Sequence, residues 1–554
     1  MLHKFHGGVH PPEHKAESNS LPIGAAPLPR RLVVPLRQHI GAPARPVVEV
    51  GDRVLKGQMI GAADGFVSAA VHAPTSGIVS AVDLHAVPHP SGLPDLCITI
   101  DADGEERWIE RQPLDYLAAD RDAVRARLRD FGVVGLGGAV FPTSIKLDPG
   151  ALRIGTLVLN GAECEPWITS DDRLMRERAA EIVEGVKIMA HLVQPERVLI
   201  GIEDNKPEAV TAMRAACSGT NFEVVAVPAQ YPGGGEKQLI QVLTGKEVPS
   251  GGRPANIGVL CANAGTAYTV HRAVNHGEPV ISRIVTVTGN VEKPQNFEVL
   301  IGTPLSEMVQ LAGGAKAGTS HYIVGGPMMG FDLNNLAVPV AKAVNCVIAA
   351  SPALFPPKPA AVPCIRCGQC AEVCPASLQP MELFWFSQSR NFDKARAYNL
   401  FDCIECGCCS YVCPSHIPLV SYYRFAKSEI AAQEREKKAA EQAKARFEFK
   451  QLREEREKAE KAARFAEKAA AAKAAAGEGD DPAAAAKKAA IQAAVERAKA
   501  KKAEAAAQAG QCDVTPIAAV ETPAESLSPC PLPPTGEGDL ESLRDGSLNT
   551  TEPP

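Results

Sequence analysis

Eight of the sixteen cysteines in this chain form two short runs with the same spacing. Residues 364–375 read CIRCGQCAEVCP and residues 403–414 read CIECGCCSYVCP, so each run has the form C-x2-C-x2-C-x3-C-P. In this pattern three thiolates bind one cubane [4Fe-4S] cluster and the fourth binds the cluster of the other run. The spacing therefore predicts two clusters, one held by Cys364, Cys367, Cys370 and Cys413 and the other by Cys403, Cys406, Cys409 and Cys374.

Zinc and disulfide bonds are the alternatives for these cysteines. Zinc sites pair two C-x2-4-C units into one set of four ligands, which two complete runs fit poorly. A disulfide framework is typical of short secreted chains, whereas this chain has 554 residues and no recognisable secretory signal. Cys408 lies next to a ligand but off the pattern, and we interpret it as a spare thiol.

Composition narrows the class of protein. The net charge of −6 argues against a nucleic-acid partner. No apolar run approaches the length that crosses a bilayer, and the first residues, MLHKFHGGVHPPEHK, lack the apolar core of a signal peptide. We therefore expect a cytosolic protein or one attached to a membrane from its cytosolic side.

The middle of the chain alternates between buried strands and helices, which predicts an α/β sheet. Strands are expected at 156–160, 197–202, 222–227 and 257–263, and helices at 171–193, 206–217 and 236–244. Ligands of such sheets bind beyond the carboxyl ends of the strands. Polar loops follow three of these strands, and they contribute Asn160, Glu163, Glu165, Gly235, Glu236, Lys237, Asn263 and Thr266.

A glycine-rich stretch, GVVGLGGAVFPTSIK, precedes this region. Glycine lets the backbone approach a ligand closely, and a following lysine adds the charge that a phosphate needs. The candidate residues are Gly135, Gly137, Gly138, Phe141 and Lys146. By itself this pattern is a weak signal, because the loop does not follow an obvious strand.

In their order, these motifs resemble a known family. GxGGAxFPxxxK, NxAExEP, Y-x3-GE and N-x2-T are similar to the flavin- and NADH-binding subunit of respiratory complex I, and more closely to the C subunit of the Rnf (Rsx) ion-translocating oxidoreductases. The resemblance implies that the glycine loop and Lys146 hold FMN. It also implies that Asn160, Glu163 and Glu165 line the flavin and nicotinamide site, which Glu236, Asn263 and Thr266 complete.

The expected fold is multidomain, α/β plus β. The barrel-sandwich-like domain resembles biotinyl and lipoyl carriers, but it has no lysine between Lys56 and Lys146 and therefore carries no swinging cofactor. The expected segments are an irregular arm (1–30), the barrel-sandwich-like domain (31–112), a Rossmann-like FMN/NADH domain (113–283), an SLBB β-grasp domain (284–355), a ferredoxin-like domain with two [4Fe-4S] clusters (356–426), charged helices (427–510) and a disordered tail (511–554).

The resemblance implies an electron-input subunit with FMN and two [4Fe-4S] clusters that oxidises NADH. We take Glu163, Glu165 and Glu236 as its catalytic candidates. Its expected partners are NAD(H), the other subunits of an Rnf/Rsx-type complex and ferredoxin or a similar carrier, at the cytoplasmic face of the bacterial inner membrane. Two alternatives stay open: a flavin and iron–sulfur cobalamin reductase of a microcompartment, and an electron-relay scaffold without flavin, because Glu236-Lys237 departs from the acidic pair of complex I.

The crossed ligand pattern makes a direct prediction. Protein purified without oxygen should contain about eight irons per chain by the ligand count. Replacing Cys374 with serine (Cys374→Ser) should damage the cluster of Cys403 and spare that of Cys364, which electron paramagnetic resonance can distinguish. Loss of the Cys364 cluster instead would refute the crossed assignment.

Overall fold

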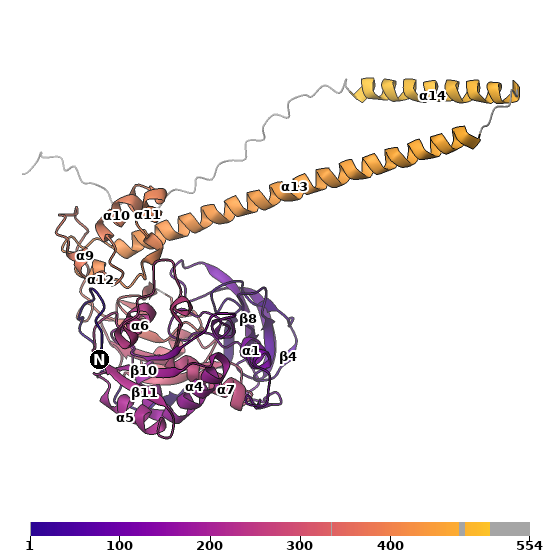
Figure 1. The fold of residues 1–554 in the computed structure, drawn as a ribbon. Helices are drawn as coiled ribbons and strands as arrows, with labels where there is room; N and C mark the ends of the chain where they lie inside the picture. Colours follow the sequence, from indigo (N-terminus) through magenta and orange to yellow (C-terminus); the bar gives the residue numbers. More distant parts are fainter. Residues whose placement is uncertain (1, 334, 476–481, 510–554) are drawn as a thin grey trace, which may run out of the picture. The chain divides into compact units, whose positions relative to one another are not determined.

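The computed structural model of the chain describes residues 2–333, 335–475 and 482–509 (Figure 1). The chain forms two units, Met1–Glu441 and Gln442–Pro554. All predicted cofactor residues lie in the first unit. Within the described ranges, every helix is too short or too polar to cross a membrane.

Two small antiparallel sheets form the barrel-sandwich domain that the sequence predicts. Their facing side chains, among them Val34, Ile60, Val79 and Ile98, are fully buried. One sheet has the order β2 (Arg31–Pro35), β8 (Pro94–Ala102), β7 (Gly77–Ala86) and β4 (Arg53–Val54), and the other has the order β3 (Arg45–Pro46), β5 (Met59–Ala62) and β6 (Val71–His72).

A parallel sheet of four strands is the centre of the predicted Rossmann-like domain. Its strands are rich in Val, Leu and Ile because both faces are covered. Their order is β11 (Phe222–Val227), β10 (Arg197–Glu203), β9 (Thr156–Gly161) and β12 (Val259–Asn263).

Helices cover both faces of this sheet (Figure 1). Helix α6 (Glu236–Thr244) packs on one face, while α4 (Ala179–Val193), α5 (Pro207–Ala216) and α7 (Ala264–Asn275) pack on the other. The helix expected at 171–193 is two helices, because the backbone leaves the helical conformation at Arg178, between α3 (Ser170–Glu177) and α4. The hydrophobic periodicity continues through this break and does not reveal it.

The strand order reverses between β9 and β12. The chain proceeds from β9 to β10 to β11 and then returns to the other side of β9 as β12. Such a reversal leaves a crevice beyond the carboxyl ends of the two strands, where open α/β sheets bind ligands. The topology therefore places a candidate site at the ends of β9 and β12.

A six-stranded sheet follows, with strands in the order β1 (Gly24–Ala25), β14 (Gln295–Leu300), β13 (Ser282–Gly289), β17 (Cys346–Ala350), β15 (His321–Val324) and β16 (Phe331–Leu333). The start of the expected SLBB β-grasp domain contains β13, β14 and α8 (Leu305–Leu311). Strand β1 belongs to the arm expected to be irregular, and it is an edge strand that pairs with β14. The arm thus forms part of the folded unit.

Short helices hold the two cysteine runs, namely α9 (Gln369–Glu372), α10 (Pro380–Gln388), α11 (Phe392–Ala397) and α12 (Cys408–Tyr411). The long helix α13 (Leu419–Ala475) begins beside them and continues past residue 426, where we expected the cluster domain to end. Its residues Tyr423, Ala426 and Ile430 are fully buried in the core that the cysteines share. A second helix, α14 (Pro482–Ala509), follows, and the tail expected at 511–554 lies outside the described residues.

This packing predicts where the chain tolerates truncation. A chain ending after Glu441 should keep its iron and its thermal stability, because it retains Ile430. A chain ending after Lys427 should lose iron and unfold at a lower temperature, since deleting a buried isoleucine costs about 2–5 kcal/mol. Equal iron content and equal melting temperatures in the two chains would contradict the role assigned to this turn of α13.

Candidate functional site

Asn263 is the last residue of β12 and Asn160 is the last but one of β9, and the two residues are paired in register. Asn160 Nδ2 donates a hydrogen bond to the Gly234 carbonyl at 2.7 Å, which joins β9 to the turn before α6. Asn263 caps α7, because its Oδ1 accepts from the Thr266 amide at 3.3 Å. The fold thus brings three predicted site residues, Asn160, Asn263 and Thr266, to one edge of the sheet. Gly234, next to the predicted Gly235, lies at the same edge.

The glycine-rich loop closes on itself beside this edge. The Gly135 amide donates to the Phe141 carbonyl at 2.9 Å. The Leu136 amide donates to Thr266 Oγ1, also at 2.9 Å, and so fixes the loop to α7.

Gly137 and Gly138 are the exposed tip of the loop. A Cβ atom at Gly137 would lie 3.2 Å from Asn263 Cβ, which is tighter than ordinary contact. Gly138 has a φ of +102°, and a Cβ there would meet no atom within 4 Å. The tip therefore combines a close approach to Asn263 with open space above it, as a loop that covers a planar ligand requires.

Lys146 lies at the end of α2 (Thr143–Lys146), and its Nζ forms an ion pair with Glu236 Oε1 at 2.5 Å. Glu236 begins α6, whose N-cap residue Gly235 has no side chain to accept from the first amides of the helix. The lysine and these amides together suit a phosphate group. A bound phosphate would replace Glu236 as the partner of Lys146.

The carboxylate of Glu163 points into the protein. Its Oε1 accepts from Ser170 Oγ at 3.1 Å and from the Asp171 amide at 2.7 Å, while its Oε2 accepts from the Asp172 amide at 3.0 Å. Glu163 thus caps the first turn of α3.

Glu165 is likewise engaged. Its Oε1 accepts from the amides of Met328 and Met329 at 2.8 and 3.1 Å, and burial raises the pKa of this carboxyl. The turn at residues 325–330 (GGPMMG) therefore contacts Glu165, a predicted site residue. Lys237 points elsewhere, with Nζ 3.7 Å from Asp402 Oδ1 in the cysteine-rich region.

Lys15 supports the Glu163–Ile168 loop and was not among the predicted site residues. Its buried Nζ donates to the carbonyls of Glu163, Glu165 and Ile168 at 2.7, 2.9 and 2.8 Å. Burial and the neighbouring Lys206 lower its pKa. The signal for this role in the sequence is weak, a single lysine at the end of GGVHPPEHK.

The eight cysteines of the two runs line two separate cavities. The first cavity contains the thiols of Cys364, Cys367, Cys370 and Cys413. The second contains those of Cys374, Cys403, Cys406 and Cys409, together with Cys408. Apart from Cys408, the two cavities contain the same two sets of four cysteines that the crossed ligand pattern predicts.

The two runs also share an unusual backbone. Arg366 and Gly368 have φ values of +56° and +84°, and the corresponding Glu405 and Gly407 have +59° and +81°. This repeated left-handed turn curls each run around its cavity. Amides point at the sulfur atoms, since the Arg366 amide lies 3.4 Å from Cys364 Sγ.

The lining of each cavity suits the iron–sulfur cluster that the cysteine spacing predicts. Four thiols of the two runs surround each cavity. Burial raises the pKa of the Cys403 thiol to about 11, so a positively charged metal group is needed to keep it as a thiolate.

The second cavity lies against the α/β domain. The Tyr231 hydroxyl donates to the Cys406 carbonyl at 2.6 Å, and Tyr231 packs with Cys408, Cys164 and Met328. At the first cavity, by contrast, Cys367 is exposed. The cysteine set of the second cavity is therefore the one next to the loops that end the sheet.

Four families of known domains match consecutive parts of the chain. They are the RnfC barrel sandwich hybrid domain (residues 3–105), the Nuo51 FMN-binding domain (128–272), the SLBB domain (284–332) and the 4Fe-4S dicluster domain (363–417). Their order agrees with the predicted domains.

Curated relatives share about half of their residues with the chain. The C subunit of the ion-translocating oxidoreductase complex of Pseudomonas aeruginosa is 53% identical over 82% of this chain and 59% of its own length. The proteins of that name from Klebsiella pneumoniae and Salmonella gallinarum are each 51% identical over 81% of this chain, and over 60% and 67% of their own lengths. The chain thus spans about three fifths of the length of the first of these relatives.

Among solved structures, a NAD+-reducing [NiFe]-hydrogenase matches with 22% identity over 50% of this chain and 54% of that chain, at a TM-score of 0.40.

The loop geometry predicts how flavin binding responds to mutation. Lys146→Ala should lower FMN occupancy because it removes the cation beside α6, and Gly137→Val should lower it further because its side chain clashes with Asn263. Lys237→Ala is the matched control, since Lys237 points away from the loop. Flavin absorbance per chain after reconstitution measures the effect. Full occupancy in the first two variants would place the flavin elsewhere.

Proposed function

Because this chain belongs to the family of C subunits of the ion-translocating oxidoreductase complex, we propose that it oxidises NADH at a bound FMN and passes the electrons on through two [4Fe-4S] clusters. The observation that carries the proposal is the junction of Tyr231 with Cys406, which joins the loops at the sheet edge to one cysteine set within a single compact unit.

The flavin would be held at the edge formed by β9 and β12. Gly135, Gly137, Gly138 and Phe141 provide the covering loop, and Lys146 with Gly235 at the start of α6 faces the phosphate. Asn160, Asn263 and Thr266 support the ring from the strand ends. When bound, FMN accepts an electron pair from NADH and releases single electrons, a conversion that no side chain performs.

In this proposal the acidic residues act mainly as supports. Glu163 and Glu165 hold α3 and the Met328 turn in place around the nicotinamide, and Glu236 exchanges its bond to Lys146 for a bond to solvent when the phosphate binds. Lys237 would join the flavin domain to the cluster domain through Asp402.

The proposed electron path runs from the second cysteine set to the first. The second set lies beside Tyr231, and Cys367 of the first set is exposed. The recipient would be another subunit of the membrane complex, and ferredoxin or a similar low-potential carrier would exchange electrons with the assembly. This assignment places the chain at the cytoplasmic face of the inner membrane as a peripheral subunit.

A relay scaffold without flavin is a second candidate. It is favoured by the pairing of both predicted cofactor-binding lysines, Lys146 with Glu236 and Lys237 with Asp402, which leaves neither cation free in the described structure.

One experiment separates the two functions. Protein purified without oxygen and reconstituted with FMN and iron should reduce a viologen dye with NADH. The Gly137→Val variant should lose this activity while keeping its iron. Retained iron without flavin binding in the wild-type protein would favour the scaffold.

A further inference from the structure

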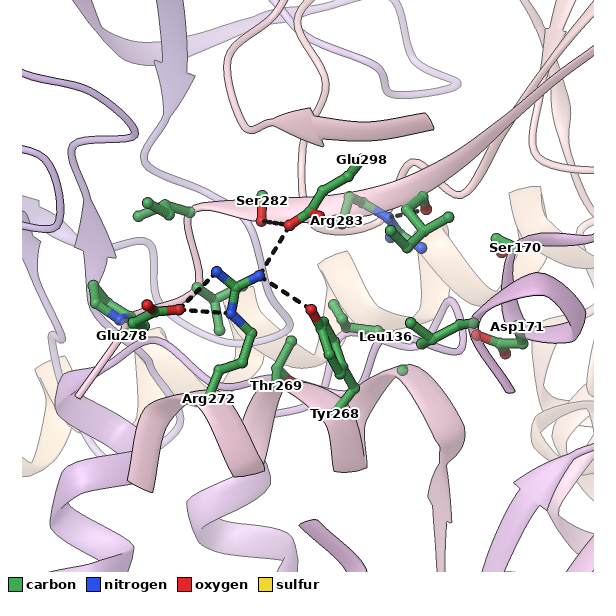
Figure 2. Close-up of a pocket in the computed structure, with 16 residues that line it drawn as sticks. Leu136, Ser170, Asp171, Tyr268, Thr269, Arg272, Glu278, Ser282, Arg283 and Glu298 are labelled. Atoms are coloured by element: carbon green, nitrogen blue, oxygen red, sulfur yellow. Dashed lines mark hydrogen bonds and ion pairs between the residues drawn. The ribbon is translucent and has the colours of Figure 1, made fainter. Parts of the chain in front are cut away.

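A cavity with room for about two water molecules lies beside α7 (Figure 2). Helix α3, helix α7 and the start of β13 form its walls. It adjoins the candidate flavin site through Leu136 of the glycine-rich loop and Gly265 of α7.

The mouth is a cluster of paired charges. Arg272 bonds to Glu278, to Glu298 at 2.9 Å and to the Tyr268 hydroxyl at 3.3 Å. Because these groups satisfy one another, the mouth presents no unpaired charge to a ligand. Figure 2 shows Tyr268 and Thr269 between this cluster and the inner end, where Ser170 and Asp171 lie. Most of the lining surface is apolar, but the hydroxyl groups of Ser170, Tyr268 and Thr269 lie along it between Asp171 and Arg272. Such groups are hydrogen-bond partners for water.

The inner end is in direct contact with predicted site residues. Asp171 Oδ2 accepts from Asn263 Nδ2 at 2.5 Å, and the Asp171 amide and the Ser170 hydroxyl both donate to Glu163 Oε1. Asp171 therefore lies between Glu163 on one side and the cavity on the other.

Charged groups from three directions face Asp171. Glu163 lies on the loop after β9, Arg283 on β13 and Lys206 on the turn after β10. Burial and the like charge of Glu163 outweigh the two cations and the Asn263 amide, and they raise the pKa of Asp171 to about 7. Asp171 can thus take up and release a proton near neutral pH.

NADH oxidation needs such a group. Each NADH yields NAD+, two electrons and one proton, and this proton has to leave the site after the electrons are passed on. We propose that Asp171 accepts this proton at the Glu163 end of the site and passes it to water in the cavity beside α7, from which it leaves at the Arg272 mouth. The inference rests on the proposed NADH oxidation.

The test compares Asp171→Asn with Glu208→Gln, an exposed carboxylate that pairs with Arg176 outside the cavity. Infrared spectra of the oxidised wild-type protein should show a carboxyl band that titrates near pH 7 and is absent from Asp171→Asn alone. NADH-dependent viologen reduction at pH 7 should fall at least about tenfold in Asp171→Asn with flavin and iron unchanged. Formate, a small weak acid, should restore part of that rate.

Thr269→Val, which removes a hydroxyl from the middle of the cavity, should give a smaller loss. The proton path is overturned if cofactor-loaded Asp171→Asn turns over at the wild-type rate, if formate has no effect on a slowed variant, or if no band titrates near pH 7. A flavin-loaded wild-type protein that fails to oxidise NADH would instead overturn the proposed function.

Discussion

The hydrogen bond from the Tyr231 hydroxyl to the Cys406 carbonyl is the contact on which the arrangement of the folded unit depends. Its donor belongs to the turn before α6 and its acceptor to a cysteine run, so it fixes the two predicted cofactor regions against each other. Desolvation strengthens the bond, because Tyr231 is buried among Cys406, Cys408 and Val9 of the arm. An electron path through the protein needs this fixed approach, and a flexible linker between the regions would not provide it.

Buried lysines hold the surrounding loops in the same way. Lys15 donates to three carbonyls of the Glu163–Ile168 loop, and Lys342 donates to the carbonyls of Ala70 and Gly132 at 3.2 and 2.6 Å. Lys342 thereby joins the connection between β16 and β17 to the barrel sandwich and to the glycine-rich loop. Burial lowers its pKa to about 7, which is the cost of placing an ammonium group among carbonyls with no carboxylate partner.

The carboxylates near the site show that a residue in a catalytic-type motif can have a structural role. Glu163 and Glu165 belong to the motif that resembles a nicotinamide site, yet their oxygens accept backbone amides of α3 and of the Met328 turn. A carboxylate that accepts two or more amides is held in one orientation, so it shapes the site without moving. Asp171 was not among the predicted site residues, because it follows the NxAExEP motif and begins a predicted helix. Only the cavity beside α7 distinguishes it from the other polar residues of that helix.

The cysteine runs, the four strands and the glycine-rich loop could be identified from the sequence, because metal ligation, strand burial and close ligand approach each demand particular residues at fixed spacings. The order of the domains followed from these patterns together with the family that the motifs resemble. The sequence did not reveal the helix break at Arg178, and it did not predict the contacts between distant segments. These contacts are those of Lys15 with the Glu163–Ile168 loop, of Ile430 with the core of the cysteine runs, and the ion pairs Lys146–Glu236 and Lys237–Asp402. These depend on which surfaces meet after folding, and a buried lysine that donates to backbone carbonyls leaves no trace in the sequence of its partners, since every residue type carries the same carbonyl group.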